Sequence, residues 1–397
     1  MTAQKRNKDW IQDYFFLIIP NPLPDELLSS WLTRMAIEHR RKLANFITLF
    51  IRNQGFEICN IDMDFQYNEK LFKTLSLKSN IHIKNIWKLS LSSEQGYLFS
   101  CNDCLYPPKQ IRKLKDKRTH NGLMFCPKCL AEDKIPYFRK KWRYYFYNAC
   151  PKHKIFLTDR CWCCYERVLF SKIEHHRGVS YCSKCEKDLS TTIAIPLQSN
   201  YKYGLKAIKW LEKGLQKGYF VINHKKVASL FVFESFTNLC FLLDRKQELV
   251  LDNFPMIEEY HAVCKKLAKY DSKKATSIQK NFILTAMVYF LFQNYPKNIL
   301  SFADTNHLTH KEFIQSFIDV PFWYKKMIDE LIPVQNKRGR EISESEVRAA
   351  IKYLQIQNTN VTQEAVAKII GCHFTIHKGF VKIYKEVTKL KILKSNV

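Results

Sequence analysis

Four pairs of cysteine and histidine residues, each with two residues between its members, constrain this chain more than any other feature. The pairs are Cys126 with Cys129, Cys150 with His153, Cys161 with Cys164, and Cys182 with Cys185. This spacing lets one tight turn present two side chains to a metal ion, and two such turns close a tetrahedral zinc site. The first two pairs therefore predict one structural zinc ion, and the last two predict a second. The adjacent Cys163 and Cys164 leave open which of them is the ligand.

Disulfides and buried free thiols are the alternatives to zinc. Disulfides need an oxidising compartment, and Met1 to Trp10 are polar and charged, without the apolar segment of a signal peptide. The sequence therefore predicts a cytoplasmic protein with reduced cysteines. Four protein ligands leave no position for an activated water, which argues against catalytic zinc. Cys101 and Cys104 form a further pair without an obvious partner pair, so their role as metal ligands stays open.

The charge of the chain favours a polyanionic partner. Its 397 residues include 64 Lys and Arg against 37 Asp and Glu, a formal net charge of +27. This excess suits nucleic acid and also anionic membranes, but the longest apolar run, Phe282 to Phe292, is too short to span a bilayer. The sequence contains neither Gly-x-x-x-x-Gly-Lys nor Gly-x-Gly-x-x-Gly, the two glycine-rich motifs that bind nucleotide phosphates. If the process needs ATP, we expect another protein to supply it.

Two stretches near the cysteine pairs concentrate basic residues. The candidates for phosphate contact in the first stretch are Lys109, Arg112, Lys113, Lys115, Lys117 and Arg118. The second stretch, Tyr137 to Tyr147, interleaves Arg139, Lys140, Lys141 and Arg143 with aromatic residues. This alternation is typical of a half-buried strand with its basic residues on the exposed face. We predict that both stretches contact nucleic-acid phosphate, with a solvated basic surface as the alternative.

A proline-rich entry precedes the first expected helix. The segment reads Pro20-Asn-Pro-Leu-Pro-Asp-Glu-Leu-Leu-Ser-Ser-Trp-Leu-Thr-Arg-Met-Ala36. Asp25 is placed to cap a helix that begins near Glu26. The apolar face of this helix comprises Leu27, Leu28, Trp31, Leu32 and Met35. A second helix is expected over Leu43 to Arg52, and the pair is equally typical of a helix-turn-helix and of a plain helical hairpin.

Several motifs together resemble the TniQ/TnsD family, the target-selection proteins of certain transposons. They are Pro-x-Pro-Asp-Glu-Leu-Leu-x-Ser-Trp-Leu-x-Arg, Cys126-Pro-Lys-Cys-Leu-Ala-Glu-Asp133, Tyr137-Phe-Arg-Lys-Lys-Trp142-Arg and Cys150-Pro-Lys-His153. The resemblance covers roughly residues 15 to 190. It implies zinc-ribbon domains, helix-turn-helix elements, DNA targeting and contact with an AAA+ ATPase. Because some members instead sit on a guide-RNA effector complex, often as homodimers, direct DNA reading and RNA-guided recruitment both stay open.

The rest of the chain has helical periodicity. Helices are expected over 203–215, 227–243, 256–270 and 278–293. Beyond a basic boundary at 333–340, Ser343 and Glu346 form a capping box. Helices over 362–372 and 373–385 then match a helix-turn-helix pattern, with an ordinary helical pair as the alternative. The residues expected to face DNA are Thr375, Lys378 and Lys382.

These observations predict a mainly α-helical, multi-domain protein in which helix-turn-helix modules flank tandem zinc ribbons. The expected domains are 1–100 (N-terminal helical), 101–190 (tandem zinc ribbons), 191–332 (helical) and 333–397 (C-terminal helix-turn-helix). Because no catalytic constellation is visible, we predict a non-enzymatic adaptor for transposition. It would link target DNA or an RNA-guided complex to an AAA+ ATPase and a transposase. A zinc-containing, DNA-binding transcription regulator is the leading alternative, and a zinc hydrolase or nuclease is a third class.

Overall fold

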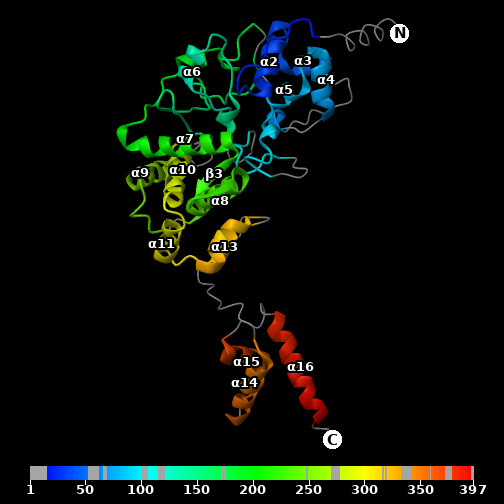
Figure 1. Cartoon of the computed structure of the whole chain (residues 1–397), viewed down its shortest axis with the longest axis vertical. Helices are drawn as coiled ribbons and strands as arrows, with labels where there is room; N and C mark the ends of the chain where they lie inside the picture. The colour runs from blue at the N-terminus through cyan, green and yellow to red at the C-terminus, as the bar shows by residue number, and fades with distance from the viewer. Residues whose placement is uncertain are drawn as a thin grey trace, which may run out of the picture. The chain divides into compact units, whose positions relative to one another are not determined.

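The computed structural model of the chain is mainly helical and divides into two compact units (Figure 1). The larger unit spans Met1–Asn306 with Ser316–Tyr324, and the smaller spans His307–Gln315 with Lys325–Val397. The structure describes residues 16–51, 62–65, 69–100, 106–114, 121–170, 173, 176–246, 249–269, 278–314, 317, 320–331, 342–357, 359–371 and 378–394. Within these ranges, no helix has the length and apolar character that a membrane span needs.

The described residues of the N-terminal part of the larger unit contain four α-helices. They are α2 (Leu28–Glu38), α3 (Leu43–Phe50), α4 (Glu69–Ser79) and α5 (Ile83–Trp87), with α2 packed on α3 and α4 on α5. The apolar face predicted for the first helix is buried in α2. Asp25 does not cap this helix, because it lies in a turn with a left-handed φ of 59° and α2 begins three residues later. The Lys140 N–H donates to the Asp25 carbonyl at 2.7 Å.

The cysteine-rich part has little regular structure. It contains α6 (Pro127–Glu132), the short antiparallel pair β1 (Ala149–Cys150) and β2 (Ile155–Phe156), and 3-10 helices η4 (Lys140–Arg143) and η6 (Leu189–Thr191). The prediction of one strand over Tyr137 to Tyr147 is wrong, because η4 interrupts it. The two ends of the stretch bond to different partners: Phe138 accepts from the Leu27 N–H, and the Tyr145 N–H donates to Gln110. A turn is needed to change partners.

A bundle around α10 completes the larger unit. Its elements are α7 (Lys202–Lys217), β3 (Tyr219–Ile222), β4 (Lys225–Ala228), α8 (Ser229–Arg245), α9 (Ile257–Lys269), α10 (Ile278–Gln293) and α11 (Lys297–Thr305). Helix α10 packs against α7, α8, α9 and α11. The approach to α7 is close, because a Cβ on Gly204 would lie 2.3 Å from the Phe282 ring. The antiparallel β3–β4 hairpin was not predicted, and it occupies the start of the helix expected over 227–243.

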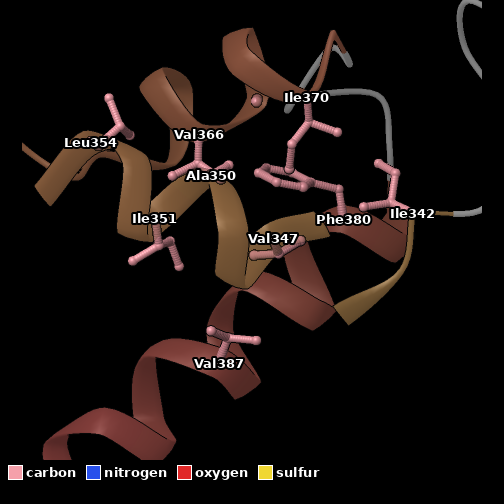
Figure 2. Close-up of a cluster of buried hydrophobic side chains, with 10 residues drawn as sticks. Ile342, Val347, Ala350, Ile351, Leu354, Val366, Ile370, Phe380 and Val387 are labelled. Carbon is pink, nitrogen blue, oxygen red and sulfur yellow. The ribbon is translucent and has the colours of Figure 1, made fainter. Parts of the chain in front are cut away.

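The smaller unit contains α12 (His310–Ile314), the greater part of α13 (Phe322–Leu331), and helices α14 (Glu344–Ile356), α15 (Gln363–Ile370) and α16 (Lys378–Lys394). The capping box of Ser343 and Glu346 is confirmed at the start of α14. Thr362 caps α15, which ends at Gly371 with a left-handed φ of 73°. Phe380 of α16 lies between α14 and α15 in a buried apolar cluster that also includes Val347 and Val366 (Figure 2). Three short helices therefore share one core.

Candidate metal centre and nucleic-acid surface

The first predicted set of metal ligands converges on one point. Cys126 and Cys129 lie at the N-terminal end of α6, while Cys150 ends β1 and His153 lies in the turn before β2. The His153 Nδ1 atom is 3.2, 3.4 and 3.5 Å from the sulfur atoms of Cys126, Cys129 and Cys150. The Cys129 and Cys150 sulfur atoms are 3.8 Å apart. All four ligand atoms lie within 4.8 Å of one another.

These distances fit a tetrahedral zinc site. Bonds of about 2.3 Å to sulfur and about 2.0 Å to nitrogen place neighbouring ligand atoms roughly 3.5 to 3.8 Å apart. Three thiols and one imidazole are also a typical donor set for structural zinc. Because Cys126 caps α6 and accepts from the Cys129 N–H at 3.4 Å, the helix terminus stabilises negative charge on its sulfur. The cluster can therefore hold a metal ion, and its chemistry is compatible with zinc.

Glu132, the last residue of α6, orients the histidine of the first cluster. Its Oε1 atom lies 2.9 Å from His153 Nε2, the ring nitrogen that faces away from the sulfur atoms. A carboxylate in this position fixes the tautomer that presents Nδ1 to a metal and makes that nitrogen more basic. The sequence motif includes Glu132, but the spacing of the ligands alone gave no reason to assign it this role.

The second predicted set of ligands also converges. The sulfur atoms of Cys161 and Cys185 are 3.5 Å apart, and those of Cys164 and Cys182 are 3.6 Å apart. All four lie within 4.8 Å of one another. Cys163 is exposed and outside the cluster, so the structure places Cys164 among the ligands. Cys101 and Cys104 lie outside the described residues.

Three of the four ligand pairs are built on the same turn. The residue after each pair has a left-handed backbone, with φ values of 52° at Lys154, 56° at Tyr165 and 55° at Glu186. In each turn, the N–H of that residue donates to the carbonyl of the first ligand, at 2.8, 3.0 and 3.1 Å respectively. The remaining pair, Cys126 and Cys129, uses the first turn of α6 instead. The two-residue spacing is therefore a geometric requirement of these turns.

Hydrogen bonding among the thiols favours a thiolate in each cluster. Bonds from the Cys126 and Cys129 thiols lower the pKa of Cys150 to about 2. In the second cluster, burial raises the pKa of Cys185, but the Lys187 N–H and the neighbouring thiols outweigh it and lower the pKa to about 7. The pKa values of Cys126, Cys129, Cys161 and Cys164 are raised, so thiolate, the form that binds metal, is favoured on one sulfur of each cluster.

The N-terminal motif builds a buried ion pair that joins the proline-rich entry to α2. Glu26 is fully buried, and its two carboxylate oxygens accept from Arg34 at 2.9 and 2.8 Å. Arg34 also donates to the Asn21 carbonyl, and the Trp31 indole donates to the Pro20 carbonyl at 2.7 Å. Glu26, Trp31 and Arg34 of this motif therefore hold the proline-rich segment against α2.

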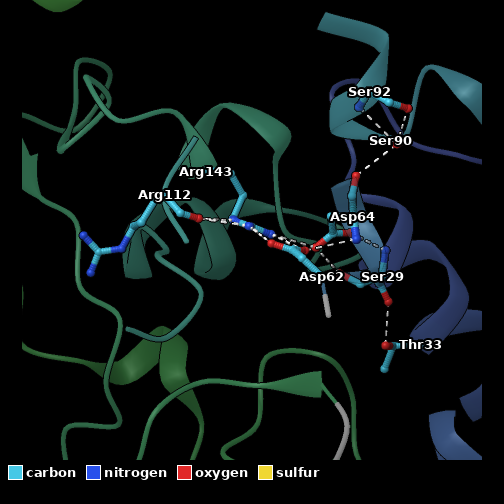
Figure 3. Close-up of polar contacts among 8 residues, drawn as sticks. All are labelled: Ser29, Thr33, Asp62, Asp64, Ser90, Ser92, Arg112 and Arg143. Atoms are coloured by element: carbon cyan, nitrogen blue, oxygen red, sulfur yellow. Dashed lines mark hydrogen bonds and ion pairs between the residues drawn. The ribbon is translucent and has the colours of Figure 1, made fainter. Parts of the chain in front are cut away.

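A second buried network joins this helical part to the cysteine-rich part (Figure 3). Arg143 is 0% exposed and ion-paired with Asp62 and Asp64. Its remaining donors reach the Arg112 carbonyl at 3.0 and 3.3 Å, so all five guanidinium N–H groups are engaged. Asp64 also accepts from the N–H and hydroxyl of Ser29 on α2. Burial raises the pKa of Asp64 to about 6, with Arg143 opposing that shift.

Several residues predicted to contact phosphate are instead buried in ion pairs. Arg112 pairs with Asp159 at 2.8 Å, Arg139 with Asp133 at 2.7 Å and Lys140 with Glu94 at 2.7 Å, and these three basic side chains are 6, 13 and 10% exposed. With Arg143, they serve internal carboxylates and do not form a basic surface. The sequence did not predict two of these pairs, because Asp159 and Glu94 lie 47 and 46 positions from Arg112 and Lys140.

Lys109 and Lys113 are exposed on the surface. Arg245, which the sequence analysis did not identify as a candidate, lies close enough to Lys109 to affect its charge. Burial lowers the pKa of Lys109, and the nearby charges of Arg245 and Lys113 lower it further. The Lys109 ammonium lies 5.6 Å from the centre of the Phe241 ring on α8. Lys115, Lys117, Arg118 and Thr375 lie outside the described residues. Lys382 of α16 is exposed, and α16 begins at Lys378.

The larger unit is thus a helical scaffold closed by buried ion pairs and by two clusters suited to structural metal. The TniQ family model matches residues 17–157, from the proline-rich entry to the end of β2. This part of the chain therefore contains a TniQ domain, as its motifs predicted. The match includes the first cluster and ends before the second. No curated protein matches the chain. The TniQ domain indicates a non-catalytic role in target selection for transposition.

Proposed function

We propose that this protein is a zinc-stabilised adaptor that links a transposition target to an AAA+ ATPase and a transposase. The observation that carries the proposal is the TniQ match over residues 17–157. The motif residues in this range bind one another or form the first metal cluster, which suits a rigid scaffold. In this proposal each cluster binds one structural zinc ion, and the metal is not catalytic.

The proposed nucleic-acid surface includes the exposed residues Lys109, Lys113 and Arg245. The fold brings these like charges together from two segments distant in the sequence, which raises their electrostatic energy. Phosphate would offset that repulsion, and neutralising each contact should reduce the salt dependence of binding. Lys115, Lys117 and Arg118 are proposed as continuations of the same basic segment on sequence grounds.

The adaptor role is tested by isolating the tagged full-length protein from cells, with and without nuclease treatment. We expect an AAA+ ATPase to be recovered in both samples, because the proposed contact is between proteins. Guide RNA and its effector proteins in the eluate would support recruitment by an RNA-guided complex, and recovery of target DNA alone would support direct reading. Promoter DNA without an ATPase would contradict the adaptor and favour a transcription regulator.

We also propose that α15 and α16 form a DNA-reading helix-turn-helix with Thr375, Lys378 and Lys382 on its contact face. The buried cluster of the smaller unit supports a compact module, and the exposed Lys382 and Lys385 lie one turn apart on α16. In this arrangement the lysines could meet base edges or phosphates in a major groove.

Neutralising Lys382 and Lys385 to glutamine should leave the thermal midpoint nearly unchanged, because both side chains are exposed. DNA affinity should fall on the order of 10-fold, with a larger loss on the preferred target than on random duplex. Fluorescence anisotropy at two salt concentrations measures both losses. Lys352→Gln, on the exposed face of α14, controls for the loss of one charge. Unchanged affinity on both duplexes would remove α16 from DNA binding.

A further inference from the structure

The β3–β4 hairpin connects α7 to α8 and packs against both helices (Figure 1). Its strands are joined by Asn223 and His224, whose φ values of 46° and 61° are those of a tight two-residue hairpin turn. Phe220 anchors the inner face, with its ring centre 4.4 Å from that of Trp210 on α7. The contact is so close that a Cβ on Gly214 would lie 2.0 Å from the Phe220 ring. The hairpin is therefore held firmly to the bundle.

The outer face of the hairpin combines apolar and basic side chains in solvent. Because strand side chains alternate between faces, Tyr219 and Val221 point away from the buried Phe220 and Ile222. Val221 is 61% exposed, and it pairs across the sheet with the exposed Lys226. Val221 therefore adds an apolar side chain to the outer face, next to a lysine.

Tyr219 holds two lysines in place on this face. The Lys226 ammonium lies 4.9 Å from the centre of the Tyr219 ring, and the Lys217 ammonium, at the end of α7, lies 5.9 Å from it. Cation–π contacts of this kind reduce the freedom of two long side chains before any partner binds. Lys225 is also exposed, but it pairs across the sheet with Ile222 and so does not belong to the outer face. Among the described residues, Lys217, Lys225 and Lys226 form no ion pair.

From this geometry we infer that the outer face of the hairpin binds the phosphate backbone of duplex DNA. A two-stranded ribbon is narrow enough to enter a major groove, where flanking lysines meet phosphates. Two ammonium groups that form no ion pair within the described part of the chain, in a protein of net charge +27, complement a polyanion. Val221, Asn223 and His224 would then lie at the groove, while Lys217 and Lys226 contact the backbone. The inference rests on the proposed nucleic-acid role and adds a contact surface separate from α16.

The test compares full-length protein with the variant Lys217→Gln/Lys226→Gln in DNA-binding titrations from 50 to 200 mM salt. Each lost phosphate contact should reduce the slope of log K against log salt by about 0.9 on duplex DNA, so a reduction of about 1.8 is expected. Single-stranded DNA and RNA probes of equal length show whether another nucleic acid is the true ligand. The control is Lys202→Gln/Lys206→Gln, the same charge change at exposed sites on the other end of α7.

The slope of log K against log salt distinguishes failure of the hairpin site from failure of the proposed nucleic-acid role. Wild-type slope in the hairpin variant, or an equal decrease in both double variants, would overturn the hairpin site while leaving the adaptor role intact. Absence of binding by the wild-type protein to every probe at 50 mM salt would overturn both the hairpin site and the proposed nucleic-acid role on which it rests. Tyr219→Leu keeps all charges but frees the lysines, so we expect an unchanged slope with affinity reduced a few-fold.

Discussion

Replacing Cys129 with serine should unfold the first cluster and lower the zinc content from two ions to one per chain. Zinc binding contributes on the order of 10 kcal/mol to the folding of small modules, and the part around β1 and β2 has little other regular structure to compensate. Cys129 is also buried, so a hydroxyl there would lose its ligand bond without gaining solvent. Elemental analysis and limited proteolysis measure both effects.

The adjacent cysteines of the second cluster supply a matched control. Cys163→Ser changes an exposed thiol outside the cluster, so two zinc ions and the wild-type thermal midpoint should be retained. Cys164→Ser, one residue later, should lose one zinc ion. If well-folded wild-type protein contains less than one zinc ion per chain, or if the two serine variants behave alike, the proposed metal sites are wrong.

Glu132→Gln separates the positioning of His153 from the presence of the ligand. A glutamine keeps the size of the side chain but removes the charge that stabilises the Nδ1-binding tautomer, 2.9 Å from His153 Nε2. Loss of such a partner typically reduces metal affinity 10- to 100-fold. In a chelator competition, the variant should therefore retain two zinc ions without chelator and release one of them at lower chelator concentration than wild type.

The sequence predicted those features whose signals are local. The capping box of Ser343 and the periodicity of α10 each depend on residues within a few turns. The two candidate metal clusters could also be predicted from the sequence, because each ligand pair lies in a turn of fixed spacing. These elements can therefore be predicted without knowledge of the tertiary contacts.

The sequence did not predict features that depend on distant partners. The basic residues of 139–143 have the pattern of an exposed strand face, yet Arg143 pairs with carboxylates about 80 positions earlier. Arg245 joins Lys109 from more than 130 positions away, so no local pattern relates them. The hairpin at 219–228 was missed because its strands have four residues each and its turn lacks glycine. In each case tertiary pairing outweighed local preference.

Arg143→Met should destabilise the larger unit by about 3–5 kcal/mol at pH 7.5, because it leaves two buried carboxylates without their cation. The network joins α2 to the cysteine-rich part, so the loss should appear as a lower free energy of unfolding in urea, measured by far-UV circular dichroism (Figure 3). The variant with Asp64→Asn added should recover part of that loss, because it removes one of the unpaired charges.

The same variant should be less impaired at lower pH. The folded-state pKa of Asp64 is raised to about 6 from an ordinary value of 3.8, so the folded protein binds this proton more tightly than the unfolded chain. Stability from this group is therefore greatest below pH 4 and is lost as pH rises through about 6. Because Arg143 opposes the shift, its removal raises the Asp64 pKa further, and protonation then relieves the unpaired charge. The difference in unfolding free energy from wild type should shrink between pH 7.5 and pH 5.5, and an unchanged difference would show that the loss comes from packing rather than charge.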